Sequence, residues 1–146
     1  MSSWVVRARR CVGPTWQEEA VMSVLEEFGV VFQRDFPVDI GGWRLFYDFR
    51  LELGGREGFL ECCLSLKPGF RGVDEAVRKA AFIEFKFRSL RVARPGALGL
   101  ALVEAPRADE ALLRERCRLV LRSVDRAFHS LSSFESWLRE EVAGRG

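Results

Sequence analysis

Two carboxylates, Asp48 and Glu61, lie in apolar segments on either side of a Gly54-Gly55 turn. If these segments are strands that pair through the turn, both side chains reach one surface near the centre of a sheet. Two ionised carboxylates at that distance repel each other unless a cation lies between them. Mg²⁺ is the natural ion for such oxygen ligands, and Mn²⁺ is the second choice. The pair therefore predicts a divalent-metal site that could polarise a phosphate and activate a water.

Side chains alternate between the two faces of a strand, and this alternation positions the carboxylates. On the first strand, Asp48 is expected to share a face with Phe46 and Arg50, and the opposite face should carry Tyr47, Phe49 and Leu51. On the second strand, Glu61 is expected to share a face with Cys63, Ser65 and Lys67, opposite Leu60, Cys62, Leu64 and Leu66. The alternative is that both carboxylates lie on a solvated face and pair with Arg50 or Arg44.

The surrounding periodicity predicts an α/β fold in the order helix, three strands, helix, strand, helix, helix. Helices are expected from Trp16 to Phe28, from Val73 to about Arg91, from Asp109 to about Phe128 and from Phe134 to Val142. Strands are expected over Val30–Ile40, Trp43–Leu53, Gly58–Leu66 and Ala97–Glu104. His129 would then end the third helix, where we assign it no catalytic role.

Length and composition favour a single domain. The chain has 146 residues, of which 48% are hydrophobic, and this supports one core rather than two. A net charge of +2 argues against a protein that coats nucleic acid, although a local basic patch stays open. We find no signal peptide and no apolar run near the roughly 20 residues of a membrane span, so a cytoplasmic protein without membrane contact is expected.

The strings Tyr47-Asp48-Phe49-Arg50-Leu51 and Phe59-Leu60-Glu61-Cys62-Cys63, joined by a Gly-rich turn within this order of elements, resemble the PD-(D/E)XK nuclease superfamily. The resemblance covers about Gly13 to Glu104. It implies a restriction-endonuclease-like core with a mixed central sheet flanked by helices, at about 13–104 of a single domain over 1–146. A helical extension follows at about 107–143.

The resemblance also assigns roles. Asp48 and Glu61 would hold the metal, and a helix-one glutamate that often completes the site maps best onto Glu18. The family's lysine position falls on Cys63, whose neutral thiol cannot offer a positive charge to the attacking water. Other members take the ammonium from elsewhere, so we consider Lys67, Lys79 and Lys86 as replacements, with Lys79 the first choice. Ordinary solvated positions are the simpler interpretation of Lys79 and Lys86.

The expected partner is nucleic acid, with DNA favoured over RNA. Lys67, Arg71 and Arg50 are the candidate phosphate contacts, and Phe70 in the 67–72 loop either stacks a base or tucks under the following helix. The aromatic C-terminal helices could form a homodimer. Two functions stay open: a metal-dependent endonuclease, or a catalytically degenerate nuclease-fold module that acts in nucleic-acid binding or protein assembly.

Overall fold

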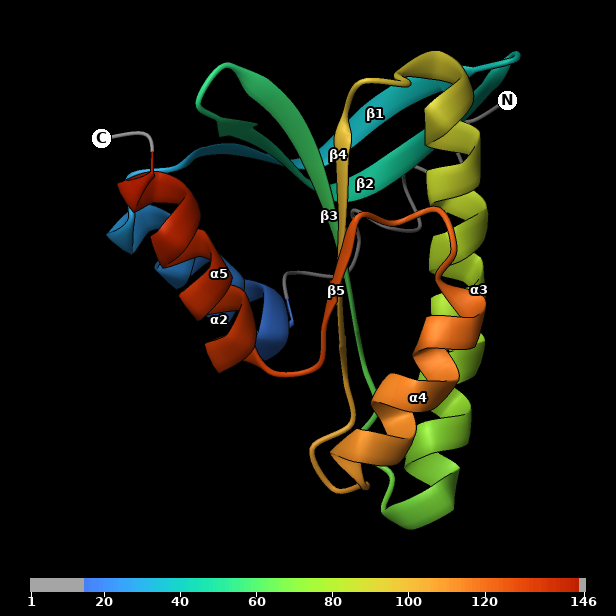
Figure 1. Ribbon diagram of the computed structural model, residues 1–146. Helices are drawn as coiled ribbons and strands as arrows, with labels where there is room; N and C mark the ends of the chain where they lie inside the picture. The colour runs from blue at the N-terminus through green and yellow to red at the C-terminus, as the bar shows by residue number, and fades with distance from the viewer. Residues whose placement is uncertain (1–14, 145–146) are drawn as a thin grey trace.

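The computed structural model describes residues 15–144, so the predicted start of the core near residue 13 lies outside the described part. A mixed five-stranded sheet forms the centre, in the spatial order β1-β2-β3-β4-β5 (Figure 1). The strands are β1 (Val31–Ile40), β2 (Trp43–Leu53), β3 (Arg56–Leu64), β4 (Leu98–Glu104) and β5 (Arg126–Phe128). The first three pair antiparallel, and β4 and β5 continue the sheet in parallel.

Helices cover both faces of this sheet. The helices within 15–144 are α2 (Trp16–Glu27), α3 (Gly69–Ala93), α4 (Glu110–Val120) and α5 (Leu131–Ala143). Figure 1 shows α2 and α5 on one face and α3 and α4 on the other. The predicted α/β fold, with its mixed sheet flanked by helices and its helical C-terminal part, is confirmed. The parallel β3-β4 pair needs a crossover, and α3 provides it.

The third helix is shorter than predicted. It ends at Val120, and the chain then forms β5 beside β4 instead of continuing as a helix to Phe128. The reason is tertiary, because the buried carboxylate of Glu84 on α3 accepts hydrogen bonds from the backbone N–H groups of Arg122 and Ser123, both at 2.8 Å. These bonds hold the chain in an extended course that helical periodicity cannot reveal.

His129 therefore follows β5 rather than ending a helix, and its predicted position is wrong. Its side chain is 7% exposed, and Nδ1 lies 2.9 Å from the carbonyl oxygen of Val103. Burial lowers the pKa of the imidazole. The neutral imidazole ring, hydrogen-bonded to the backbone, therefore has a structural role in holding the segment after β5 against β4.

The second predicted helix begins four residues earlier than expected, at Gly69 rather than Val73. Residues 69–72 of the predicted 67–72 loop thus form the first turn of α3, and the N–H of Gly69 donates to the carbonyl of Arg107 at 3.1 Å. Phe70 is 76% exposed, so it does not tuck under the helix.

Simple alternation fails on β2, and this failure lies at the candidate site. Tyr47 packs with Phe59 against α3, whereas Phe49 packs with Phe32 on the α2 side, so the two do not share a face as predicted. The neighbouring strand changes face at the same level, next to Asp35, whose φ of 48° is in the left-handed region. At the level of Asp48, both strands therefore reverse which alternate side chains face each side of the sheet; we call this reversal the turnover of β1 and β2. On β3 the predicted alternation holds, with Leu60 and Cys62 opposite Cys63.

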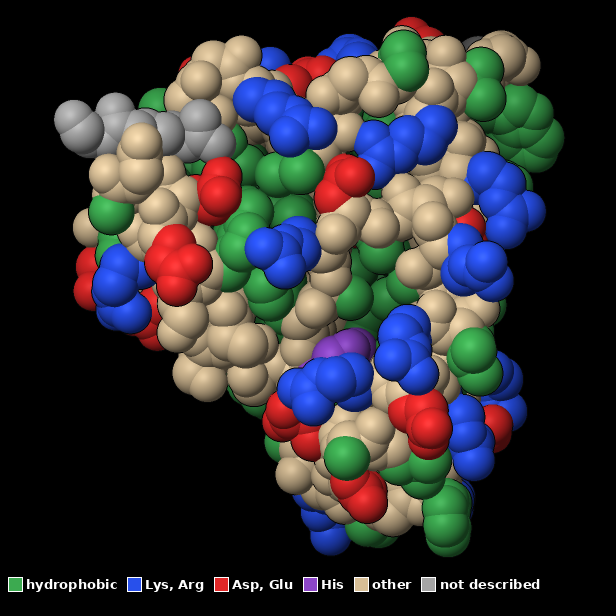
Figure 2. Space-filling view, in the orientation of Figure 1, with side chains coloured by type: hydrophobic (Ala, Val, Ile, Leu, Met, Phe, Trp, Pro, Cys, Tyr) green, Lys and Arg blue, Asp and Glu red, His purple; other side chains and the backbone are tan. Residues whose placement is uncertain are grey.

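Charge is mixed over the molecular surface. On the face shown in Figure 2, Lys and Arg side chains are interspersed with Asp and Glu, which agrees with the small net charge. Among the described residues, no helix is both long enough and apolar enough to cross a membrane.

The start of α3 is packed closely against the end of the preceding segment, which gives a stability prediction. A Cβ on Gly72 would lie 2.1 Å from the carbonyl oxygen of Lys67. Gly72→Ala should therefore lower the free energy of unfolding by about 1–3 kcal/mol, measured by urea denaturation. Gly96→Ala is the matched control, because a Cβ there meets nothing within 4 Å. Equal stabilities for the two variants would contradict this packing.

Candidate functional site

Asp48 and Glu61 hold each other in place through the backbone. The N–H of Asp48 donates to Glu61 Oε2 at 2.6 Å, and the N–H of Cys62 donates to Asp48 Oδ2 at 2.8 Å. Each carboxylate thus accepts from an N–H group on the opposite strand. These two bonds lie just beyond the last paired residues of β2 and β3, which are Phe49 and Leu60. The two side chains are only 6% and 4% exposed, so they are not the solvated carboxylates of the alternative interpretation.

Lys86 of α3 brings a positive charge to the same place. Its ammonium lies 2.8 Å from Glu61 Oε1 and also donates to the backbone carbonyl of Phe46. The side chain is 2% exposed and stands over the ring of Tyr47 at 4.9 Å. The Tyr47 hydroxyl donates in turn to the carbonyl of Lys86 at 2.6 Å. The interpretation of Lys86 as a solvated helix position is therefore wrong.

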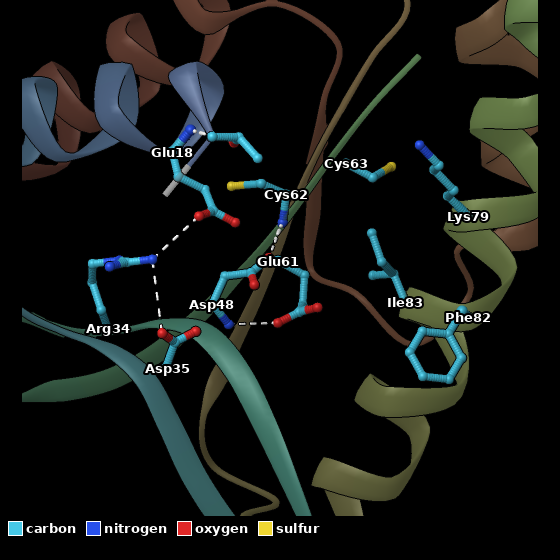
Figure 3. A pocket seen from close by; sticks show the side chains of 11 residues that line it. Glu18, Arg34, Asp35, Asp48, Glu61, Cys62, Cys63, Lys79, Phe82 and Ile83 are labelled. Atoms are coloured by element: carbon cyan, nitrogen blue, oxygen red, sulfur yellow. Dashed lines mark hydrogen bonds and ion pairs between the residues drawn. The ribbon is translucent and has the colours of Figure 1, made fainter. Parts of the chain in front are cut away.

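Asp48 and Glu61 line a pocket of about 340 Å³. Figure 3 shows Glu18 and Arg34 on one side of the pocket, Lys79 and Phe82 on the other, and the two central carboxylates between them. Residues from α2, β1, β2, β3 and α3 contribute, and they include Thr15, Asp35, Cys62, Cys63 and Ile83. The turnover of β1 and β2 at Asp35 and Asp48 is what brings groups from both helix layers to one cavity.

Glu18 faces the central carboxylates from the first turn of α2. Burial, followed by the negative charge of Asp48, raises the pKa of its carboxyl group. Arg34 offsets part of this effect with an Nη2 that lies 3.3 Å from Glu18 and 3.7 Å from Asp35. The Nε of Arg34 is buried and has no hydrogen-bond partner among the described residues. This donor of the guanidinium is thus unsatisfied within residues 15–144.

The two adjacent cysteines carry no usable charge. Burial raises the pKa of Cys63 to about 12, and it raises that of Cys62 well above the ordinary thiol value, assisted there by the charges of Asp48 and Glu61. Both thiols are therefore protonated at neutral pH. This agrees with the expectation that Cys63 cannot replace the ammonium of a lysine.

Lys79 of α3 also lines the pocket, but its ammonium contacts the end of β3 instead of Glu61. Its ammonium donates to the carbonyl of Leu64 at 2.8 Å and lies 4.0 Å from Glu75. The side chain is 47% exposed, so it can reach a bound ligand at the rim. Lys79 and Lys86 are two helical turns apart on α3, and only Lys86 is bonded to Glu61.

The other predicted contacts lie away from the pocket lining. Lys67 pairs with Glu75 at 3.1 Å, and Arg71 is exposed on the first turn of α3. Arg50 pairs with Glu57 at 2.6 Å and lies over the ring of Phe36. Of the predicted site residues, the pocket collects Glu18, Asp48, Glu61, Cys63 and Lys79.

The donor set fits one kind of metal site and excludes another. Within 15–144, no three or more His, Cys, Asp or Glu side chains are grouped so as to hold a metal ion. A cage of protein ligands alone is therefore not formed by these residues. Two carboxylates at an open pocket fit Mg²⁺ or Mn²⁺, which commonly take one or two carboxylates and complete their shell with water and substrate phosphate.

The sequence could not show that Lys86, rather than Lys79, contacts Glu61. Lys79 and Lys86 occupy equivalent positions seven residues apart on the same helix, so helical spacing cannot separate them. The register of α3 along β3 decides between them, and that register is set by tertiary packing. Arg34 carried no signal beyond its place on a strand, and its role depends on the turnover at Asp35.

Comparisons with known proteins support the fold and assign no family. No protein-family model matches the chain, and no curated protein matches it. The crystal structure of AF1548, described as a protein of unknown function, is similar with a TM-score of 0.52 and 15% sequence identity. The match covers 77% of this chain and 55% of AF1548, so the chain spans about half the length of that protein. The likeness concerns the α/β architecture alone.

The buried ion pair gives a stability prediction. Lys86→Met leaves the Glu61 carboxylate buried without its cation, and we expect a loss of about 3–5 kcal/mol in the free energy of unfolding. Adding Glu61→Gln should recover part of that loss, because no uncompensated charge then remains. Urea denaturation of the single and double variants measures the coupling. Lys79→Met is the control and should change stability by less than about 1 kcal/mol. A Lys86→Met protein as stable as the parent would contradict the pairing.

The raised thiol pKa values predict slow alkylation. At pH 8, a thiol with a pKa near 12 is ionised in only about one molecule in 10,000, against roughly one in four for an ordinary thiol. Iodoacetamide should therefore leave Cys62 and Cys63 unmodified in the folded protein and modify both in guanidinium chloride, as followed by peptide mass spectrometry. Equal rates in the two states would show that these thiols are not protected.

Proposed function

We propose that this chain is a nuclease-like domain that binds nucleic acid and hydrolyses phosphodiester bonds with a divalent cation held by Asp48 and Glu61. The observation that carries the proposal is that two buried carboxylates line an open pocket and are joined to each other, and that one of them, Glu61, is also bonded to the buried ammonium of Lys86. We further propose that the domain belongs with the PD-(D/E)XK nuclease superfamily. The order of its elements and the positions of Asp48 and Glu61 support this assignment.

Lys86 supplies the charge that the family's motif lysine supplies at the position of Cys63. Its ammonium is fixed by Glu61 and by the carbonyl of Phe46, so its position does not depend on a flexible side chain. A fixed cation beside the reacting phosphate stabilises the negative charge that develops during attack. The metal ion, when bound, would polarise the phosphate and activate the attacking water.

The remaining pocket residues suit binding and proton handling. Arg34 has an unpaired Nε, and Lys79 extends an ammonium from the opposite wall, so a phosphate between them meets cations on two sides. Glu18 has a raised pKa, which makes it a better proton acceptor from a pocket water than an exposed carboxylate is. We therefore assign Arg34 and Lys79 to phosphate binding and Glu18 to orientation or deprotonation of water. DNA as the preferred substrate and a homodimer through the C-terminal helices stay predictions.

One observation favours the second candidate, a module that binds nucleic acid or a protein without cleaving. Both oxygens of Glu61 already accept hydrogen bonds, from the N–H of Asp48 and from Lys86. A carboxylate bonded in this way holds a metal less readily than one exposed to water. The degenerate module would keep the fold and the pocket and would show no dependence on Mg²⁺.

Cleavage and metal binding separate the two candidates. Labelled single-stranded DNA, duplex DNA and RNA are incubated with Mg²⁺, Mn²⁺ or EDTA, and Mg²⁺ binding is followed by calorimetry. We expect metal-dependent cleavage that falls at least about 100-fold in Asp48→Asn, Glu61→Gln and Lys86→Met, because each removes a charge next to the phosphate. Metal binding should be lost in the two carboxylate variants and kept in Lys86→Met.

Asp39→Asn is the matched control, because Asp39 is an exposed strand carboxylate paired with Arg44 at 2.8 Å, away from the pocket. It should cleave at the parent's rate, and circular dichroism should show that every variant is folded. A parent protein that binds nucleic acid equally with Mg²⁺ and with EDTA, and cleaves none, would support the non-catalytic module instead.

A further inference from the structure

Two aromatic rings lie exposed on α3 beside the pocket. Phe82 and Phe85 are 60% and 53% exposed, and their rings stack with centroids 6.1 Å apart at an interplanar angle of 24°. Phe82 lines the pocket, and its ring centre lies 6.0 Å from the Lys86 ammonium. Exposure of these two apolar rings to water is unfavourable, and a ligand that covered them would be stabilised. Because the pair lies at the rim of a cavity with several charged side chains in its lining, it suits a ligand that is both flat and charged.

Basic residues lie on the same helix as this pair. Along α3, Arg78, Phe82 and Phe85 follow one another at spacings of four and three residues and so lie on one stripe of the helix. Lys79 and Phe82 extend from α3 on the same side of the pocket (Figure 3). The helix as a whole carries six Lys and Arg against three Asp and Glu, so its charge is complementary to phosphate although the whole chain is nearly neutral.

We propose that Phe82 and Phe85 form a stacking surface for unpaired bases, so that the ligand of this pocket is a single-stranded nucleic acid or an unpaired end. Aromatic rings stack on the face of any base, whereas the bases inside a duplex cover each other's faces. Lys79 contacts the phosphate that follows the stacked base and directs the strand toward Asp48 and Glu61. The inference deepens the proposed function by naming the form of its substrate, and it rests on that function for the direction of the strand.

The test compares binding to three probes by fluorescence anisotropy in EDTA, where cleavage does not interfere. The probes are a 15-nucleotide oligothymidylate, an abasic strand with the same sugar-phosphate backbone, and a blunt hairpin duplex. The parent protein should prefer the oligothymidylate over the abasic strand by about 5- to 150-fold, the range for one stacked base. It should also prefer the oligothymidylate over the duplex.

Substitutions at the two rings separate stacking from simple hydrophobic contact. Phe82→Leu with Phe85→Leu keeps apolar volume and removes the aromatic faces, and it should reduce the preference over the abasic strand to about one. Phe82→Tyr with Phe85→Tyr should retain the preference. Val92→Ser is the control, since Val92 is 79% exposed on the same helix and does not line the pocket, and it should bind as the parent does.

Several results would overturn the inference. Equal binding of the oligothymidylate and abasic strands by the parent, or an unchanged preference in the leucine variant, would remove the stacking surface. A parent that is dimeric by light scattering and becomes monomeric with Phe82→Ser and Phe85→Ser would show instead that a second copy of the chain covers these rings.

The same measurements keep this inference separate from the proposed function. A parent that prefers the base-bearing strand but cleaves nothing with Mg²⁺ would support the stacking surface and contradict the nuclease. A parent that cleaves with Mg²⁺ but shows no base preference would support the nuclease and contradict the stacking surface.

Discussion

The contact between Lys86 and Glu61 is the interaction on which the candidate site depends. The ammonium and the carboxylate are only 2% and 5% exposed, and they face each other at 2.8 Å, so their attraction offsets much of the cost of removing both from water. The pair fixes α3 against β3, and Glu61 in turn holds the backbone of Asp48. Three elements from separate parts of the chain are thereby joined at one place. Asp48 and Glu61, which line the pocket, are therefore held in fixed positions, as a site that positions a phosphate requires.

The second constraint is the turnover of β1 and β2. A regular sheet would keep the α2 layer and the α3 layer apart, with each strand presenting alternate side chains to the two sides. The positive φ of Asp35 and the break in alternation at Asp48 let Arg34 and Glu18 approach the carboxylates from one side while Lys79 and Phe82 approach from the other. The irregularity costs backbone hydrogen bonds, and the carboxylates of Asp48 and Glu61 replace two of them. The unusual backbone of Asp35 thus lies beside the residues to which we assign the chemistry.

Particular residues show how far the sequence alone could lead. The α/β order, the long second strand and the closeness of Asp48 to Glu61 follow from local patterns and one glycine turn, and the structure contains them. The predicted end of this third helix, at about Phe128, was wrong, because Glu84 lies 38 residues from the N–H of Arg122 that it binds. The contact between Lys86 and Glu61 could not be predicted for a similar reason, since Lys79 and Lys86 on one helical stripe differ only in what lies opposite them. Long-range packing decided each of these points, and no local pattern carries that information.

The most direct measurement is anomalous diffraction from crystals of the protein soaked in MnCl₂, collected near the manganese edge. If Asp48 and Glu61 form a metal site, an anomalous peak will lie within about 2.2 Å of an oxygen of each carboxylate, and crystals of the Asp48→Asn protein will lack it. An empty pocket at millimolar Mn²⁺, with Glu61 still bonded to Lys86, would contradict the metal-dependent nuclease and leave a binding module built on the same fold.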